Sequence, residues 1–379
     1  MGANPLIGVV YHWIGGLASA SNFIPFRPIR RWSWEIYWIV QGFAAWIVAP
    51  AVLGYLFVPG LSSVLHQTPS VTMWHCFFWG AMWGVGGLTF GLAIRYLGIA
   101  LGYAIALGFC TAFGTLMPPI FSGQIHAIVH QRGGQVILLG VFVCLVAIAV
   151  NGMAGYSKEK EVSAEEKALL GERDYSFAKG LAVAIFAGIM SACFAYGLAA
   201  GKPIAGLTRV QLASDHRALL WQNLPVLVVV LWGGFTTNLI WSVILILRNH
   251  SGRQFLGAPG VNPMGTDAPV KIDTRHPERA SRLSPSELAR NYVLAALAGV
   301  LWYFQFFFYS MGQTKMGKYD FSSWTLHMAS IIIFATLWGI ALREWHDTSV
   351  RTRLLVGCGL FLLVGSTVVV GYGNFLVAR

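Results

Sequence analysis

Charged side chains are scarce in this sequence. Asp, Glu, Lys and Arg make up 11% of its 379 residues, whereas hydrophobic residues make up 56%. A soluble domain carries roughly 25% charged residues. The composition therefore excludes an ordinary soluble protein and predicts a chain that contacts the lipid bilayer. Long apolar runs without period-two alternation exclude a β-barrel, so we expect an all-α membrane protein.

Paired cysteines and the signatures of common enzymes are also missing. The five cysteines lie in apolar runs without a CxxC pair, which indicates small core residues rather than disulfides or metal ligands. No HExxH, G-x-S-x-G or Walker loop occurs, and nothing resembles a nucleic-acid-binding motif. His126 and His130 have the spacing of metal ligands, but no carboxylate or thiol is near them in sequence. We therefore expect no enzyme, no metal site, no cofactor and no nucleic-acid partner.

Apolar runs predict ten membrane-spanning helices of about 20 residues each. They lie at residues 5–26, 35–58, 73–93, 97–121, 135–154, 178–200, 221–247, 291–312, 322–342 and 354–376. Lys and Arg then predict the orientation. The odd-numbered connections hold 19 of them, and the even-numbered connections with the C-terminus hold 7. Because basic loops stay in the cytoplasm, we expect both termini on the outside. The net charge of +11 follows from the same loops and does not require nucleic acid.

A charged stretch divides the chain into two halves. Residues 155–177 are expected to form a cytoplasmic linker between a first five-helix repeat, 1–154, and a second, 178–379. Residues 248–290 form a long cytoplasmic loop, in which Ser284, Pro285 and Glu287 resemble the cap of a short helix. An odd number of spans on each side gives the halves opposite orientations. Inverted repeats with a site near the membrane midplane are typical of secondary transporters.

A weak sequence similarity between the two halves is consistent with this repeat. Ser19–Phe23 precedes Arg27-Pro28, and Ser191–Phe194 precedes Lys202-Pro203. The similar segments are short, so they add only modest support to the predicted inverted 5+5 arrangement.

Five polar or amphipathic side chains gather in two neighbouring spans. Gln305 and Tyr309 are spaced i and i+4 on one helix, and Asp320, Trp324 and His327 form a stripe on the next. These groups together are typical of a small-molecule site in an apolar setting. The alternative is that the aromatic residues belong to an interfacial belt, Asp320 caps a helix and His327 is a core residue.

Two further polar residues lie in the first two spans. Glu35 is the one carboxylate before Lys158. It fits either the first turn of a helix capped by Ser33, or a cytoplasmic-side proton site or gate ion pair with an arginine. His12 either bonds to a neighbouring helix or belongs to the same site as His327.

Trp83 accompanies a run of glycines in the third span. Gly80, Gly84, Gly87 and Gly91 are expected to let helices approach closely. Trp83 is either a packing residue or an indole face against the apolar side of a sugar.

A carboxyl group removed from water holds its proton more tightly. We therefore expect Asp320, or His327 beside it, to bind a coupling proton.

Several strings resemble the bacterial L-rhamnose–proton symporter family of the drug/metabolite transporter superfamily. They are FxPFxxIxxWSWE from Phe23, GAMWGVG (80–86), RYLGIALG (95–102), GTLMPPI (114–120), LWYFQFFFY (301–309), YDFSSWTLHM (319–328) and REW (343–345). The resemblance implies ten helices in an inverted 5+5 arrangement and proton-driven uptake of a 6-deoxyhexose across the bacterial inner membrane. The family pattern has asparagines in the third span where this chain has Gly86–Thr89, so the sugar can differ from rhamnose.

These observations predict a proton-coupled symporter that imports a small neutral sugar, L-rhamnose or a related 6-deoxyhexose, by alternating access. The expected binding residues are His12, Trp83, Gln305, Tyr309, Trp324 and His327, and the expected proton or gate residues are Asp320 and Glu35. The alternative is a facilitator or exporter of another small metabolite without proton coupling. A membrane-embedded enzyme with His12 or His327 as general base is a third possibility.

Overall fold

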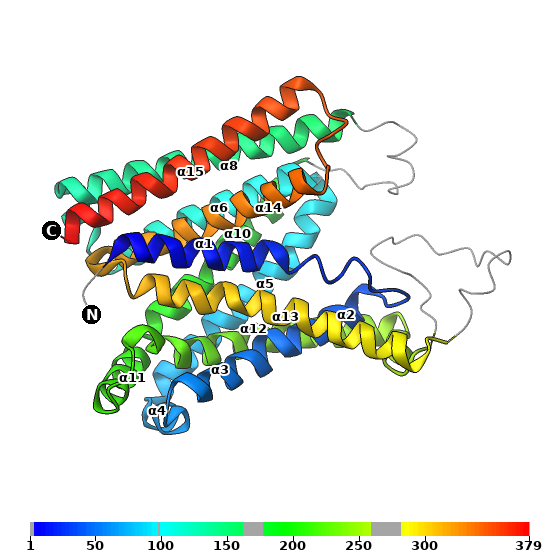
Figure 1. Cartoon of the computed structure of the whole chain (residues 1–379), viewed down its shortest axis with the longest axis horizontal. Helices are drawn as coiled ribbons and strands as arrows, with labels where there is room; N and C mark the ends of the chain where they lie inside the picture. Colours follow the sequence, from blue (N-terminus) through cyan, green and yellow to red (C-terminus); the bar gives the residue numbers. More distant parts are fainter. Residues whose placement is uncertain (1–3, 98, 162–176, 259–281, 379) are drawn as a thin grey trace.

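The computed structural model of the chain describes residues 4–97, 99–161, 177–258 and 282–378, and the described part folds as a bundle of long helices (Figure 1). The long helices are α1 (Pro5–Ser21), α5 (Ser70–Leu97), α6 (Ile99–Phe121), α8 (Arg132–Glu161), α10 (Phe177–Ala200), α12 (Leu224–Arg248), α13 (Pro285–Gln313), α14 (Ser323–Ala341) and α15 (Val350–Ala378). A further long helix is continuous through α2 (Trp34–Phe43), a π-helical turn η1 (Ala44–Val48) and α3 (Ala49–Phe57).

Shorter helices connect the long ones. They are α4 (Leu61–Gln67), α7 (Ile125–His130), α11 (Lys202–Ser214), and the 3-10 helices η2 (Leu219–Trp221), η3 (Ser251–Leu256) and η5 (Gly317–Ser322). The start of α1, the end of α15, α4, α7 and α11 lie at one end of the bundle, here termed the terminal end (Figure 1). The connection between α1 and α2, η3 and the start of α13 lie at the opposite end, here termed the loop end.

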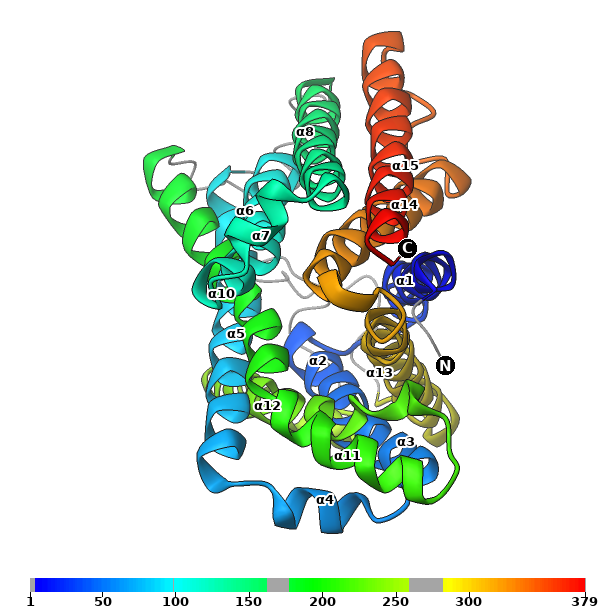
Figure 2. The same ribbon diagram turned by 90° about the vertical axis from the view of Figure 1, so that its left-hand side faces the viewer.

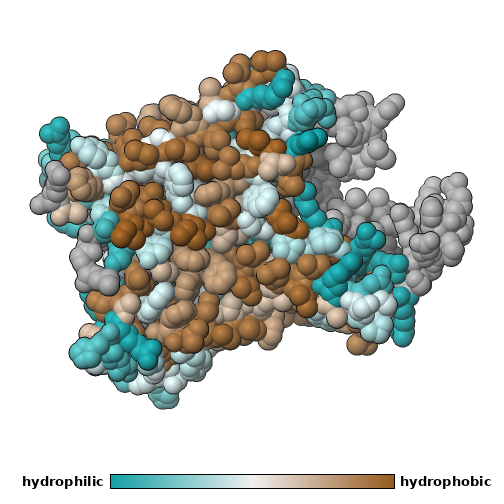
Figure 3. Space-filling model, viewed as in Figure 1, coloured by the Kyte–Doolittle hydropathy of each residue, from teal (hydrophilic) through white to brown (hydrophobic). Residues whose placement is uncertain are grey.

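Nine helices of the described residues are long and apolar enough to cross a membrane. Figure 3 shows the matching surface, a broad hydrophobic band between hydrophilic ends. The chain is therefore a multi-pass membrane protein. The first predicted span, 5–26, is not among these nine and was predicted too long: α1 ends at Ser21 after 17 residues. Pro25 and Pro28 follow, and proline removes the N–H that would continue a helix.

The second span contains a local change of helical pitch. Its π-helical turn lies at Ala44–Val48, just before Pro50. Because proline lacks an N–H and clashes with the carbonyl four residues earlier, an α-helix cannot continue unchanged there. The wider turn contains Trp46, which lies within 5.3 Å of Trp302 between ring centroids.

The helices of the two halves interleave. α1 packs against α13 and α14, and α10 packs against α5 and α6. α2 contacts both α12 and α13, and α12 also contacts α5. α6 packs against α8 and α14, while α8 and α15 form a long pair on one side of the bundle (Figure 2).

Glycines explain one of these contacts. A Cβ on Gly80 would lie 2.0 Å from the carbonyl oxygen of Val230, and one on Gly84 would lie 2.9 Å from that of Gly234. The prediction of close approach is thus confirmed for these two, where α5 meets α12. It is wrong for Gly87 and Gly91, where a Cβ would meet nothing within 4 Å.

The predicted cap at Ser284 is present but begins a much longer helix than expected. Ser284 and Glu287 form a reciprocal capping box, in which the Ser284 amide donates to Glu287 Oε2 at 2.9 Å. The helix that follows, α13, runs without a break to Gln313. The short predicted helix and the eighth span are therefore one element. Most of the predicted 155–177 linker and residues 259–281 of the long loop lie outside the described residues.

Candidate functional site

Four of the predicted binding residues meet where α1, α13 and α14 pack together. The Tyr309 ring lies 5.3 Å from His12, 5.1 Å from His327 and 5.9 Å from Trp324, between centroids. All four side chains are buried. Spacing within α13 and α14 predicted this face, but the contribution of α1 depends on the tertiary fold.

The fifth aromatic residue, Trp83 on α5, joins the same cluster through two phenylalanines. Phe194 and Phe306 stack at 4.1 Å, and Trp83 lies 5.1 Å from Phe194 and 5.8 Å from Phe306. Phe194 also lies 5.9 Å from Trp324. Neither phenylalanine is predictable as a site residue from the sequence, since an apolar aromatic in a spanning helix carries no distinguishing signal. Together these rings form what we term the central aromatic cluster.

The two histidines of this cluster are polar groups in an apolar setting. His12 and His327 are both 0% exposed, and none of their four ring nitrogens has a hydrogen-bond partner among the described residues. A buried unpaired polar group costs about 1–3 kcal/mol. Such groups are retained in membrane proteins mainly where they act on a ligand or a proton.

Gln305 faces α1 one turn away from Tyr309. Ser19 Oγ donates a hydrogen bond of 3.0 Å to Gln305 Oε1, while Gln305 Nε2 has no partner among the described residues. The predicted shared face of Gln305 and Tyr309 is therefore the face that packs on α1. Gln305 Nε2 is thus a further polar group without a partner in the described part of the chain, in addition to the ring nitrogens of the two histidines, and it can act as a hydrogen-bond donor.

Trp324 is fixed against α6 by its indole nitrogen. Nε1 donates a hydrogen bond of 3.0 Å to the carbonyl oxygen of Cys110. Gly114 makes room for the ring, because a Cβ there would lie 2.3 Å from Nε1. Beside it, the hydroxyls of Thr115 and Thr325 are 2.8 Å apart. These contacts orient the indole face toward Phe194 and Tyr309.

Asp320 lies in η5, two residues before the N-cap residue of α14, and not at the cap itself. It lines a polar cavity of about 950 Å³ at the terminal end, formed with α11, the turn before α12 and the end of α13. Asp320 lies within electrostatic range of Lys202 and Tyr309. Leu198 and Ala205 also line this cavity and belong to the core that contains Tyr309 and Trp324. The cavity is therefore next to the central aromatic cluster.

Glu35 lies at the loop end of the bundle and is 4% exposed. Its hydrogen-bond partners are far from it in the sequence. Ser251 Oγ and Asn249 Nδ2 donate hydrogen bonds to Glu35 Oε1 at 2.7 and 3.1 Å. Ser33 is the N-cap residue of α2, as predicted, but its side chain does not cap the helix. Its hydroxyl instead donates to Gln254 Oε1 at 3.0 Å.

More hydrogen bonds join the same segments at the loop end. Trp32 Nε1 donates to the Gln254 carbonyl oxygen at 3.1 Å, and the Ser33 amide donates to Gln254 Oε1 at 2.7 Å. Asn291 Nδ2 donates to the Arg30 carbonyl oxygen at 2.9 Å. Together with the Glu35 contacts, these bonds tie the start of α2 to η3 and to α13. We term this set the loop-end latch.

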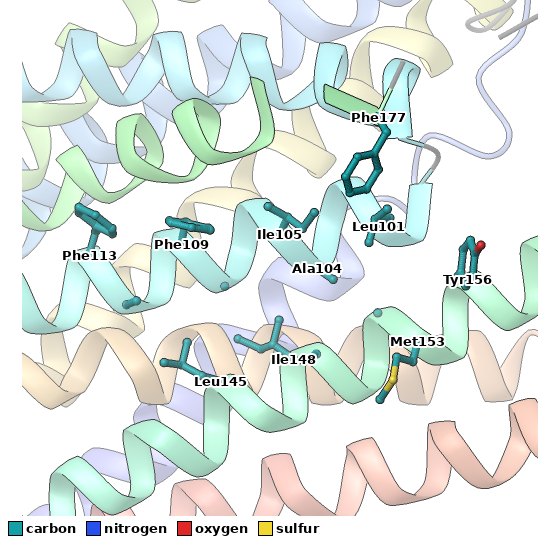
Figure 4. A pocket seen from close by; sticks show the side chains of 14 residues that line it. Leu101, Ala104, Ile105, Phe109, Phe113, Leu145, Ile148, Met153, Tyr156 and Phe177 are labelled. Atoms are coloured by element: carbon teal, nitrogen blue, oxygen red, sulfur yellow. The ribbon is translucent and has the colours of Figure 1, made fainter. Parts of the chain in front are cut away.

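A second cavity, of about 610 Å³, lies between α6 and α8 (Figure 4). Its lining is apolar apart from the Tyr156 hydroxyl, with Phe109, Phe113 and Ile148 on its walls. A sugar placed there would lose the hydrogen bonds of its hydroxyls to water without replacement. This groove is unsuited to a polar solute.

Spanning helices that bury polar groups without partners among the described residues, next to a polar cavity, are typical of a membrane transport protein. The chain matches the family described as L-rhamnose-proton symport protein (RhaT) over residues 1–253 and 280–375, and it belongs to that family. The family is one of symporters, so the protein is a transporter and not an enzyme.

Three similar proteins span nearly the whole chain. An L-rhamnose-proton symporter of Salmonella gallinarum is 31% identical over 368 residues, 97% of each chain. Those of Shigella sonnei and Cronobacter sakazakii are 31% identical over 371 residues and 32% identical over 368 residues. They cover 97% of this chain, and this chain covers 98% and 97% of theirs.

Proposed function

We propose that this protein imports a small sugar, L-rhamnose or a related 6-deoxyhexose, together with a proton. The observation that carries the proposal is the pair of buried histidines, His12 and His327. Their rings lie beside Tyr309, and their ring nitrogens have no hydrogen-bond partner in the part of the chain that the structure describes. Sugar hydroxyls are hydrogen-bond donors and acceptors that would satisfy these nitrogens and Gln305 Nε2. The ring faces of Trp324 and Trp83 would pack on the apolar C–H face and the C6 methyl group.

The chain is proposed to contain ten spanning helices as an inverted 5+5 repeat of the drug/metabolite transporter type. Helix packing supports this: in such a repeat each long helix of residues 1–154 corresponds to the fifth one after it. The contacts of α1 with α13 and α14 then correspond to those of α10 with α5 and α6. The contact of α13 with α2 corresponds to the contact of α5 with α12. Exchanging the two halves leaves three further contacts unchanged, because each joins a helix to its own counterpart: α2–α12, α6–α14 and α8–α15.

Two glycine pairs give residue-level support for the same repeat. Gly8 and Gly16 on α1 recur 172 positions later as Gly180 and Gly188 on α10. The same offset separates the similar segments that begin at Ser19 and Ser191. A Cβ on Gly8 would approach α13, and one on Gly180 would approach α5. A Cβ on Gly16 would lie 2.5 Å from Ser330 Cβ on α14. One on Gly188 would lie 2.6 Å from the Ala106 carbonyl oxygen on α6.

Alternating access is the proposed mechanism. The loop-end latch holds one end of the bundle together, while the cavity beside Asp320 lies next to the central aromatic cluster at the terminal end. A sugar would enter from the terminal end and leave at the loop end after the latch opens. We propose that Glu35 acts as a gate residue in the latch and Asp320 as the proton-binding group.

The proposed setting is the bacterial inner membrane with both termini in the periplasm. The basic residues of the loop end support it, since such loops stay in the cytoplasm. With this orientation the cavity faces the periplasm, as a sugar importer requires.

The test is uptake of labelled L-rhamnose into proteoliposomes. With an imposed pH gradient, alkaline inside, the sugar should accumulate above its outside concentration, and a protonophore should abolish the accumulation. Equilibration without accumulation would identify a facilitator instead. Asp320→Asn should keep sugar exchange and lose the response to the gradient. Full gradient-driven uptake by Asp320→Asn would remove Asp320 from proton coupling.

A further inference from the structure

The cavity at the terminal end carries more positive charge than a neutral sugar requires. Its walls hold five cationic side chains and one carboxylate, that of Asp320. The cations are Lys202, Arg209, Arg217, Lys315 and Lys318. A concave surface lined by charges of one sign focuses their field and concentrates ions of the opposite sign.

The position of these cations is unusual for a membrane protein. With the termini outside, as proposed above, the outer face holds seven Lys and Arg in all, and five of them line this one cavity. Basic residues are disfavoured in outer connections. Their concentration in a single cavity therefore requires a reason other than topology, and binding of an anion supplies one.

Three of these cations lack a carboxylate partner: within the described residues, Arg209, Arg217 and Lys318 make no ion pair with one. Arg209 Nε donates to the neutral amide oxygen of Gln222 at 2.9 Å, which fixes the guanidinium at the cavity wall. Lys318 Nζ lies 5.5 Å from the ring centroid of Tyr319.

The cavity also contains neutral groups suited to hydroxyls. Asn223 Nδ2 donates to Gln313 Oε1 at 3.2 Å, and Gln222 and Thr314 complete a polar strip on the wall. Each amide keeps further donor or acceptor capacity beyond this bond. The volume of about 950 Å³ is within the range that binds small ligands.

We propose that this cavity binds an acidic monosaccharide, a hexuronate or an aldonate. Its carboxylate forms charge-assisted hydrogen bonds with Arg209, Arg217 and Lys318, and its hydroxyls bond to the amides and Thr314. The inference rests on the proposed sugar transport and extends the substrate class of the same protein to anionic sugars. A carboxylate without a sugar ring lacks the hydroxyl contacts, and a neutral sugar lacks the ionic ones.

Binding to the purified full chain tests the proposal. Thermal stability is measured at constant ionic strength with D-galacturonate, D-galactose, acetate or inorganic phosphate. Galacturonate should raise the melting temperature and bind at least tenfold more tightly than galactose. Raising the salt from about 0.05 to 0.5 M should weaken galacturonate binding severalfold, since exposed charges are screened. Equal shifts with galactose would overturn the proposal, as would acetate or phosphate shifts matching that of galacturonate.

Charge removal locates the site. The double variant Arg209→Gln/Lys318→Gln should weaken galacturonate binding at least tenfold and leave the thermal shift with L-rhamnose unchanged. Arg132→Gln, a basic residue at the same end outside the cavity, is the matched control and should bind galacturonate like the wild type. Unchanged galacturonate binding by the double variant would overturn the proposal.

Uptake of L-rhamnose, measured in the same preparations, separates the two proposals. Gradient-driven uptake of L-rhamnose without galacturonate binding would overturn the acidic-sugar site alone. Galacturonate binding without gradient-driven uptake of L-rhamnose would overturn the proposed function and leave the site.

Discussion

The hydroxyl of Ser251 donates a 2.7 Å hydrogen bond to Glu35, a residue 216 positions earlier in the chain. Asn249 donates a second bond to the same carboxylate oxygen. One buried carboxylate thus joins the start of α2 to the segment that follows α12. In the proposed mechanism, opening of the loop end breaks these bonds, so the charge on Glu35 should affect the proposed gate.

The first prediction concerns this charge. Glu35→Gln keeps the shape of the side chain and replaces charged hydrogen bonds, worth about 1.5–3 kcal/mol each, by neutral ones worth about 0.5–1.5. The loss of about 1–1.5 kcal/mol per bond shifts the proposed gate toward opening by about tenfold for each bond. We expect sugar exchange to persist and gradient-driven accumulation in proteoliposomes to fall by at least that factor.

Glu161→Gln is the matched control for Glu35→Gln. Glu161 accepts hydrogen bonds of 2.6 Å from the hydroxyls of Ser349 and Thr352, where α8 meets α15. It is a carboxylate with hydroxyl partners at the same end of the bundle but outside the latch. The control should accumulate sugar like the wild type. Full accumulation by Glu35→Gln as well would exclude a gating role for its charge.

The second prediction concerns the unpaired histidines. His327→Leu removes two buried nitrogens that have no partner among the described residues. Without sugar, the variant should be more stable than the wild type by about 1–3 kcal/mol, because the unpaired polar group is gone. The stabilisation by L-rhamnose should disappear, and a thermal-shift titration measures both effects. A less stable variant that still responds to the sugar would contradict the binding role of His327.

The third prediction tests the two corresponding helix contacts. Gly16→Ala and Gly188→Ala each place a methyl group 2.5–2.6 Å from an atom of the neighbouring helix. Overpacking of this kind costs about 1–3 kcal/mol, so both variants should lose thermal stability to a similar degree. Gly87→Ala is the control, because a Cβ there meets nothing within 4 Å. A stability loss as large in Gly87→Ala would show that the close contacts are not responsible.

The fourth prediction concerns the indole of Trp324. Trp324→Phe keeps an aromatic ring but removes the donor to the Cys110 carbonyl oxygen. A neutral hydrogen bond contributes about 0.5–1.5 kcal/mol, so the melting temperature should fall by about 1–5 °C. Sugar affinity should weaken, since the ring is no longer held against α6. Trp74→Phe, at a side chain 61% exposed, should change neither quantity. An unchanged affinity in Trp324→Phe would place the indole outside the binding site.

Several features of the site were predictable because they depend on spacing within one helix. Gln305 and Tyr309 share a face because residues four apart do so in any α-helix. Trp324 and His327 lie on one stripe for the same reason, and both reach the central aromatic cluster. The capping box at Ser284 was recognisable because its two partners are three residues apart.

Other features were not predictable because they depend on which helices pack together. Nothing near Glu35 in sequence indicates Ser251, and the sequence suggests an arginine partner instead. Phe194 and Phe306 resemble any other apolar residue until they stack at 4.1 Å. The end of α1 at Ser21, ahead of two prolines, also shortened a span that hydropathy alone extended to residue 26.

The sequence by itself determined that this chain lies in a membrane as long helices, since so few charges cannot support a soluble surface. It also determined which residues share a face within each helix, because that follows from helical periodicity. Only the tertiary structure decided that His12 meets Tyr309 and that five cations line one cavity with Asp320. Those groupings arise from close contacts between helices far apart in the chain, which local periodicity does not encode.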